Sequence, residues 1–275
     1  MAGALLLGAR TAAAQPLTMS QIVQSGAITG STPGAVVWAP DSRTVAFVWD
    51  STGGNGTRDV WLVSADGRTR RALSLTAEGA PAARGTTARG AAVREIAWRA
   101  DSRALYLLRG ELLLRATLAG GTAARVTLDT MAVVAADARE LALSPAGDRA
   151  AYVRNGDVWT VSLTSPASTP AQLTRVSVPS IATVPLGTYA RLDREIGSGT
   201  WGTAAPSFAW APDGRTLAVH VVDRRAVRTV PFPYYLGAET QLNVLRRSYP
   251  GDPNESRQVA LVDVTSGTLT PLPFD

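Results

Sequence analysis

The sequence predicts an all-β fold of the β-propeller class, and three observations lead to that prediction. Two apolar strands joined by a polar turn recur four times, with Trp38, Trp98, Leu143 and Trp210 as aligned anchors. A second hairpin follows in each unit, so each unit holds four short strands, as a propeller blade does. The second strands, such as residues 45–49 (VAFVW), are almost continuously apolar, which indicates burial on both faces.

Turn chemistry supports the strand order within each unit. Type I turns are predicted at residues 39–42 (APDS) and 211–214 (APDG). In each, the fixed backbone φ of proline suits the second position of the turn, and the polar or glycine residues that such turns prefer follow it. Asn155-Gly156 between two apolar runs is a strong hairpin signal. A β-sandwich is the structural alternative, but it does not explain a period of four strands.

The repeats also define the domain organisation. We interpret residues 15–275 as a partial propeller whose four blades are interrupted by two insertions. The first insertion, 175–207, precedes the fourth unit, and the second, 224–256, lies between that unit's second and third strands. Long insertions in a repeat often carry function. The predicted blades cover residues 35–76, 94–128, 139–175 and 207–275.

The first 14 residues are typical of the end of a signal peptide. An apolar run at 4–7 is followed by small residues, and Ala12 and Ala14 fit the positions before a cleavage site. The basic segment that usually precedes the apolar run of a signal peptide is missing. The alternative to a signal peptide is an Ala-rich helix that frays at its end. We therefore expect a signal-peptide remnant at 1–14 and an exported protein, periplasmic or secreted. No apolar run approaches the ~20 residues of a membrane span.

Composition excludes several classes of function. The chain has no Cys and a single His, which excludes thiol catalysis, Cys-ligated metals and multi-His metal sites, so no cofactor and no metal are expected. The net charge is +5, but the arginines are scattered, so no nucleic-acid groove is predicted. His220 lies in a predicted buried strand, where a core or inter-blade role is favoured over a catalytic one. Packing between blades is also expected for several tryptophans: Trp49, Trp61, Trp98, Trp159 and Trp210.

The fourth unit and its surroundings resemble a known family. The turn at 210–214 (WAPDG) leads into 216–223 (TLAVHVVD), then Val-Pro at 230–231, then 249–254 (YPGDPN), and residues 16–23 (PLTMSQIV) resemble a mature amino terminus. In this order the motifs are similar to the N-terminal β-propeller of the dipeptidyl-peptidase IV branch of the prolyl oligopeptidase serine peptidase family. The resemblance implies an eight-bladed propeller, of which four blades are visible here.

The resemblance also implies partners that this chain does not itself encode. In that family a C-terminal α/β-hydrolase domain carries the catalytic residues, and the propeller admits peptides with a free amino terminus. No G-x-S-x-G elbow occurs in the sequence, so no catalytic residue is expected and the chain alone is predicted to be inactive. The resemblance allows a homodimer of the full enzyme.

Candidate binding residues follow from the same resemblance. The family holds the substrate's amino terminus with two adjacent carboxylates on a propeller insertion, since a buried ammonium needs compensating charge and acceptors. Glu195 is the best match here, Arg194 stands where another acid is expected, and Asp193 shares a face with Glu195 if the segment is extended. Arg194 pairing with one carboxylate would blunt such a site, and a solvated loop salt bridge is the alternative.

Two functions therefore remain open at this stage. The first is the substrate-gating propeller portion of an exported serine exopeptidase that resembles dipeptidyl-peptidase IV. The second is a stand-alone periplasmic propeller of the Tol type that binds other proteins.

Overall fold

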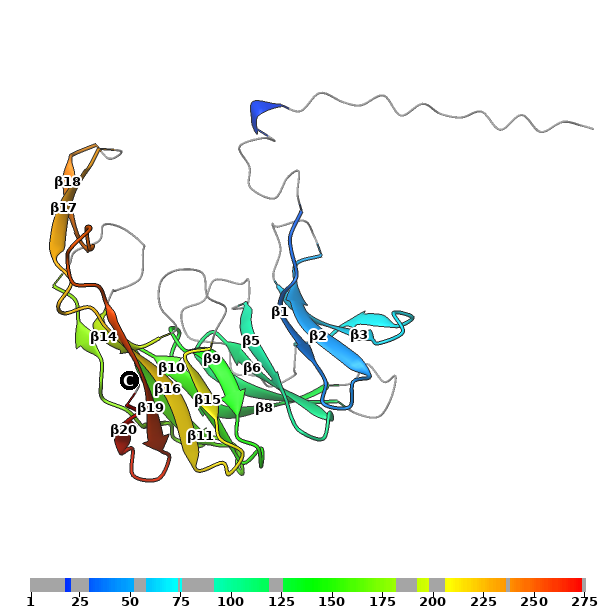
Figure 1. The fold of residues 1–275 in the computed structure, drawn as a ribbon. Helices are drawn as coiled ribbons and strands as arrows, with labels where there is room; N and C mark the ends of the chain where they lie inside the picture. Colours follow the sequence, from blue (N-terminus) through cyan, green and yellow to red (C-terminus); the bar gives the residue numbers. More distant parts are fainter. Residues whose placement is uncertain are drawn as a thin grey trace, which may run out of the picture.

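The computed structural model describes residues 18–20, 30–51, 58–73, 75, 92–118, 126–181, 192–197, 206–235 and 238–273. Within them the fold is all-β, with four-stranded antiparallel sheets that lie side by side in chain order along a curved row (Figure 1). The predicted β-propeller class is confirmed. The predicted leader at 1–14 lies outside the described residues.

The first three sheets are simple meanders, and we call them blades 1 to 3. Each has its strands in sequence order, so the connections are all hairpins. Blade 1 contains β1 (Gly34–Trp38), β2 (Thr44–Trp49), β3 (Asp59–Ser64) and β4 (Arg70–Ala72). Blade 2 contains β5 (Val93–Trp98), β6 (Ala104–Arg109), β7 (Leu112–Leu118) and β8 (Val126–Val133). Blade 3 contains β9 (Arg139–Leu143), β10 (Arg149–Arg154), β11 (Asp157–Ser162) and β12 (Ala171–Gln172).

The fourth sheet, blade 4, is larger because the first insertion adds two strands to it. Its own strands are β15 (Phe208–Trp210), β16 (Thr216–Asp223), β19 (Ser256–Asp263) and β20 (Leu269–Pro271). The first insertion adds β13 (Val178–Pro179) and β14 (Leu192–Ile196) to this sheet, whereas the second forms a separate ribbon of β17 (Thr229–Tyr234) and β18 (Gln241–Arg246). β15 covers only the first half of β16, so the second half is free to pair with β14.

The four sequence anchors occupy equivalent places. Trp38, Trp98, Leu143 and Trp210 each end the first strand of a blade and pair with the residue seven positions later. Four positions after each anchor the backbone φ is positive, which L side chains rarely adopt. The values are 59° at Ser42, 57° at Ser102, 69° at Gly147 and 65° at Gly214.

The core lies between blades rather than within one sandwich. Three apolar clusters fill the junctions of blades 1 and 2, 2 and 3, and 3 and 4. The second strands of blades 2 and 3 contribute to clusters on both sides, and residues 104–108 of β6 are all buried. This two-sided burial explains why these strands read as continuous apolar runs.

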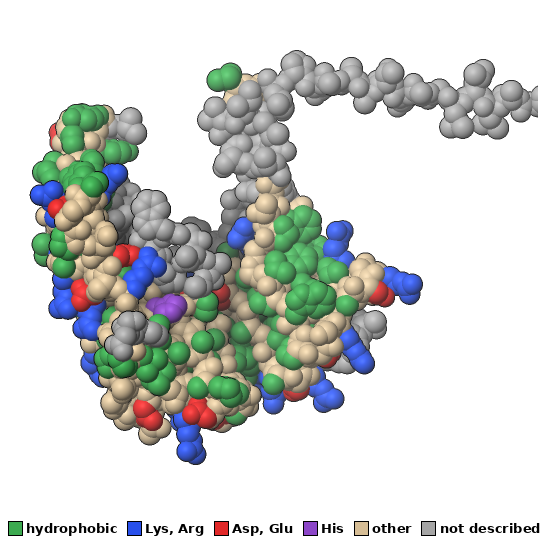
Figure 2. All heavy atoms as spheres, viewed as in Figure 1, with side chains coloured by type: hydrophobic (Ala, Val, Ile, Leu, Met, Phe, Trp, Pro, Cys, Tyr) green, Lys and Arg blue, Asp and Glu red, His purple; other side chains and the backbone are tan. Residues whose placement is uncertain are grey.

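Tryptophan packing follows this pattern in part. Trp98, Trp159 and Trp210 pack against the inter-blade clusters, as expected. Trp49 and Trp61 instead contact each other edge to face at 5.6 Å, on the side of blade 1 turned away from blade 2. Hydrophobic side chains gather on that side (Figure 2).

His220 is half-buried in β16, where it pairs with Val259 of β19. Its neighbours Val219 and Val221 point into the junction with blade 3, so the alternation of the strand places His220 on the opposite face. In the described part of the chain, no helix is long and apolar enough to be a candidate membrane span.

Candidate functional site

The three residues that the resemblance nominated lie on one strand. Asp193, Arg194 and Glu195 belong to β14, which pairs with β16 on one side and β13 on the other. The β10–β11 turn of blade 3 packs against this strand, since Ile196 N–H donates to the Gly156 carbonyl at 2.7 Å. The site therefore lies where blade 3 meets blade 4.

This close approach explains the glycine of the predicted hairpin turn. Gly156 has a φ of 74°, and a Cβ built there would lie 2.2 Å from Leu192 Cδ1 and 2.9 Å from Glu195 Cβ. A side chain at this position would strain the turn and displace β14. Gly156 thus sets the distance between the turn of blade 3 and the strand that carries Glu195.

Asp193 is buried, and its carboxylate is committed to groups of the same chain. Oδ1 accepts hydrogen bonds from Arg246 Nε at 2.6 Å and from Ser180 Oγ at 2.7 Å, and Oδ2 accepts from Arg246 Nη2 at 2.6 Å. Burial alone would raise the pKa of Asp193, but the hydrogen bonds from Arg246 and Ser180 hold it below its ordinary value. Because Arg246 ends β18, Asp193 ties β14 to the base of the β17–β18 ribbon.

Glu195 is less completely engaged. Its Oε1 accepts from Arg224 Nη1 at 2.8 Å, whereas its Oε2 has a longer ion pair of 3.8 Å with Arg139 Nη2. Arg224 also binds Glu255, with Nε 3.0 Å from Oε2, so one guanidinium bridges two carboxylates. Each carboxylate oxygen can accept more than one hydrogen bond. Oε2 of Glu195 is therefore the acceptor at which this network can take a further cation.

Arg194 pairs elsewhere. Its Nε is 3.7 Å from Asp223 Oδ2, and Asp223 is also held by Arg225 at 2.5 Å. The hydrogen bond from Arg225 lowers the pKa of Asp223. Among the described residues the ion-pair partner of Arg194 is thus Asp223, not Asp193 or Glu195.

Sequence reasoning missed the residues that complete this network. Arg224 and Glu255 lie 29 and 60 positions from Glu195, and Arg246 lies 53 positions from Asp193, so no local motif reveals them. One signal was present: an insertion within a blade must leave and re-enter the sheet at adjacent strands. The two ends of the predicted insertion 224–256 therefore had to lie near each other and near β16.

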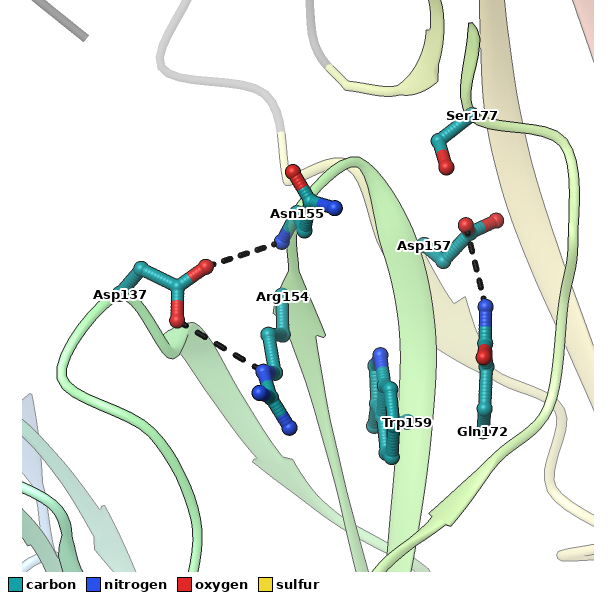
Figure 3. Close-up of a pocket in the computed structure, with 7 residues that line it drawn as sticks. All are labelled: Asp137, Arg154, Asn155, Asp157, Trp159, Gln172 and Ser177. Carbon is teal, nitrogen blue, oxygen red and sulfur yellow. Dashed lines mark hydrogen bonds and ion pairs between the residues drawn. The ribbon is translucent and has the colours of Figure 1, made fainter. Parts of the chain in front are cut away.

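A small polar pocket adjoins this site on the blade 3 side. Its volume is about 260 Å³, and it lies beside the turn that contacts β14 (Figure 3). The Arg154 guanidinium stacks 4.8 Å from the centre of the Trp159 ring and pairs with Asp137, while Gln172 donates to Asp157. The residues lining the pocket are Asp137, Arg154, Asn155, Asp157, Trp159, Gln172 and Ser177.

Asp157 in this pocket serves the fold. It is 2% exposed, and its Oδ1 accepts from Thr174 Oγ1 at 2.8 Å and from Val176 N–H at 2.7 Å. It thereby fixes the segment that leads from blade 3 toward β13. In the described part of the chain no group of three or more His, Cys, Asp or Glu side chains could hold a metal ion.

Comparison with known protein families finds one match, in the region of blade 4. Residues 203–274 match the model of the dipeptidyl peptidase IV (DPP IV) N-terminal region. The match covers about a quarter of the chain. The matched residues include β15, β16, both strands of the ribbon and β19, and β14 joins the same sheet. The resemblance inferred from the 210–254 motifs is thus confirmed.

Solved structures of DPP IV-like proteins have the same fold. Dipeptidyl peptidase 4 of Porphyromonas gingivalis superimposes with a TM-score of 0.56 at 16% identity, over 95% of this chain and 36% of that one. A candidate dipeptidyl aminopeptidase IV of Bacteroides ovatus gives a TM-score of 0.52 at 12% identity, over 91% and 31%. TolB of Acinetobacter baumannii gives 0.42 at 13% identity, over 88% and 43%. No curated protein sequence matches. The chain thus spans about a third of the length of the two peptidases.

Proposed function

We propose that this chain is the N-terminal propeller portion of an exported DPP IV-like serine peptidase. In that enzyme it limits access to a catalytic α/β-hydrolase domain and helps to select peptides with a free amino terminus. The family match over residues 203–274 is the observation that carries the proposal. It is supported by the position of β14, which pairs with β16 of the matched segment.

Glu195 is the residue we propose to contact the substrate. A peptide ammonium that loses water on entering the ring needs a charged acceptor. Oε2 of Glu195 can supply it, while Arg224 holds the other oxygen and fixes the side chain. Asp193 acts differently in this proposal, as a positioning residue that holds Arg246 and the ribbon.

The first test is to read the gene beyond the codon for Asp275. An in-frame α/β-hydrolase domain with a G-x-S-x-G elbow is expected. A stop codon followed by an unrelated gene would refute the peptidase proposal and favour the stand-alone, Tol-type alternative.

The second test is kinetic and uses the longer enzyme. Glu195→Gln should raise KM for a dipeptide–nitroanilide with a free amino terminus by about tenfold, because a charge-assisted hydrogen bond to the substrate weakens. Glu111→Gln is the matched control, since Glu111 lies in an exposed turn of blade 2. Equal KM values for the two variants would remove Glu195 from the binding site.

A further inference from the structure

The polar pocket of blade 3 holds charged groups that the proposed function does not use. Arg154 and Asp157 are directly paired across the β10–β11 hairpin, so their side chains lie on the same face of the sheet. Among the described residues, however, Arg154 takes Asp137 as its ion-pair partner, at 3.7 Å. Figure 3 shows Arg154 on one side of the Trp159 ring and Asp157 on the other. The pocket therefore keeps a guanidinium and a carboxylate apart.

The Arg154 guanidinium is held in place but makes no hydrogen bond within the described part of the chain. It stacks over the Trp159 ring, and the Asp137 oxygen nearest to it is 3.7 Å from Nε, beyond hydrogen-bond distance. The Arg154 side chain is 37% exposed, so a small molecule can reach it. A planar guanidinium with free N–H groups is suited to bind a carboxylate through two parallel hydrogen bonds.

The Asp157 carboxylate has spare capacity at one of its oxygens. Oδ1 accepts two hydrogen bonds from the fold, whereas within the described residues Oδ2 accepts only from Gln172 Nε2, at 3.3 Å. Each carboxylate oxygen can accept two hydrogen bonds. Asn155 and Ser177 line the same pocket, and among the described residues neither side chain has a hydrogen-bond partner. Their side-chain oxygens and Asp157 Oδ2 together offer three acceptors, as many as the N–H groups of an ammonium.

The charges that line the pocket restrict the class of ligand. A simple anion would meet two carboxylates, Asp137 and Asp157, and a simple cation would meet the Arg154 guanidinium. A neutral molecule would leave the separated charges without partners after displacing their water. A molecule that carries a carboxylate and an ammonium a few bonds apart matches both groups. Pockets for drug-sized ligands measure about 300–1,000 Å³, so the volume of about 260 Å³ suits a smaller molecule.

We propose that this pocket binds a free α-amino acid in its zwitterionic form. Arg154 donates to the carboxylate of the amino acid through its guanidinium. Asp157 Oδ2 accepts from the ammonium, together with the side-chain oxygens of Asn155 and Ser177. The two-residue turn at 155–156 separates this pocket from Glu195. The inference does not rest on the proposed function, because none of these pocket groups belongs to the ion pairs of Glu195.

The test measures binding of L-alanine to the full-length protein by isothermal titration calorimetry. Two matched analogues each lack one charge: N-acetyl-L-alanine has no ammonium, and L-alanine amide has no carboxylate. L-alanine should bind at millimolar concentration. Each analogue should bind about tenfold more weakly or worse, because each loses its charge-assisted hydrogen bonds to one side of the pocket.

Variants then locate the binding site. Arg154→Met should weaken L-alanine binding about tenfold or more, and Ser177→Ala about threefold, with circular dichroism equal to that of the parent protein. Arg99→Met is the matched control, since Arg99 is 49% exposed and lies 3.6 Å from Asp101 outside the pocket. This control should leave the dissociation constant within about twofold, because an exposed ion pair contributes little.

Three results would overturn the proposal. These are the absence of L-alanine binding at millimolar concentration, equal binding of either analogue, and an affinity that Arg154→Met leaves unchanged. Glu195→Gln separates this pocket from the proposed substrate site, because it should leave L-alanine affinity within about twofold if the two sites are independent. Loss of binding in Glu195→Gln but not in Arg154→Met would place the amine at Glu195. That outcome would support the proposed function and refute the amino-acid pocket.

Discussion

The contact between Asp193 and Arg246 allows a quantitative prediction. The two side chains are 5% and 12% exposed, and two bonds of 2.6 Å join them. Asp193→Asn keeps the shape but removes the charge and leaves Arg246 buried beside a neutral amide. Losing one partner of a buried pair costs about 3–5 kcal/mol. Because the amide oxygen can still accept one bond, we expect a loss near the lower end, about 3 kcal/mol.

The pH dependence of this loss follows from the lowered pKa of Asp193. A carboxyl group whose pKa is lower in the folded state stabilises the fold above its unfolded pKa, about 3.9, and loses that contribution as pH falls through the folded value. The parent chain and Asp193→Asn should therefore differ fully at neutral pH and converge in acid. Urea denaturation followed by tryptophan fluorescence at a series of pH values measures this difference.

Two controls separate the ion pair from a general effect of substitution. Arg246→Met combined with Asp193→Asn completes a double-mutant cycle that isolates the pair. Arg68→Met is the matched surface substitution, since Arg68 is 86% exposed and 3.7 Å from Asp66, and it should leave stability unchanged. A loss below about 1 kcal/mol for Asp193→Asn, or no coupling in the cycle, would refute the reasoning.

Three further substitutions test other parts of the fold by the same denaturation assay. Tyr152→Phe should raise the free energy of unfolding by about 1 kcal/mol, because the buried Tyr152 hydroxyl has no hydrogen-bond partner among the described residues. The same burial raises the pKa of Tyr152 to about 12. A lower free energy of unfolding for the variant would mean that the hydroxyl has a partner. Glu95→Gln should stabilise at neutral pH, because burial, with a smaller contribution from the Glu140 charge, raises the Glu95 pKa. The advantage should vanish as pH falls through that raised value, and a pH-independent difference would contradict this cause. Ser42→Gly should stabilise by about 0.5–1 kcal/mol, because its φ of 59° suits glycine, and Gly214→Ala at the equivalent position should do the opposite.

Local sequence predicted the repeating parts of this fold well. The anchors and the turns after them depend on interactions within about ten residues, and their positive φ values fall at the same offset in every blade. The network around β14 was not predictable in this way. Arg224 and Arg246 meet β14, and Glu255 meets Arg224, only because the second insertion leaves and rejoins blade 4 at neighbouring strands. A pattern within one segment therefore nominated Glu195 but could not show which groups already neutralise its charge.

Neutralisation of this kind bears directly on the recognition of a peptide's amino terminus that we propose. Two carboxylates held together repel each other and bind a cation strongly, and here the cation already present is Arg224, between Glu195 and Glu255. In the function we propose, a substrate ammonium must therefore share Glu195 with a resident guanidinium instead of filling an empty acidic pair. Among the described residues of this network the arginines outnumber the acids, which weakens a purely electrostatic attraction for amines. Discrimination for a free amino terminus would then depend on the hydrogen-bond geometry at Oε2 and on exclusion by the ring. The groups in this balance are Arg139, Arg194, Arg224, Arg225, Arg246 and Arg257 against Glu140, Asp193, Glu195, Asp223 and Glu255.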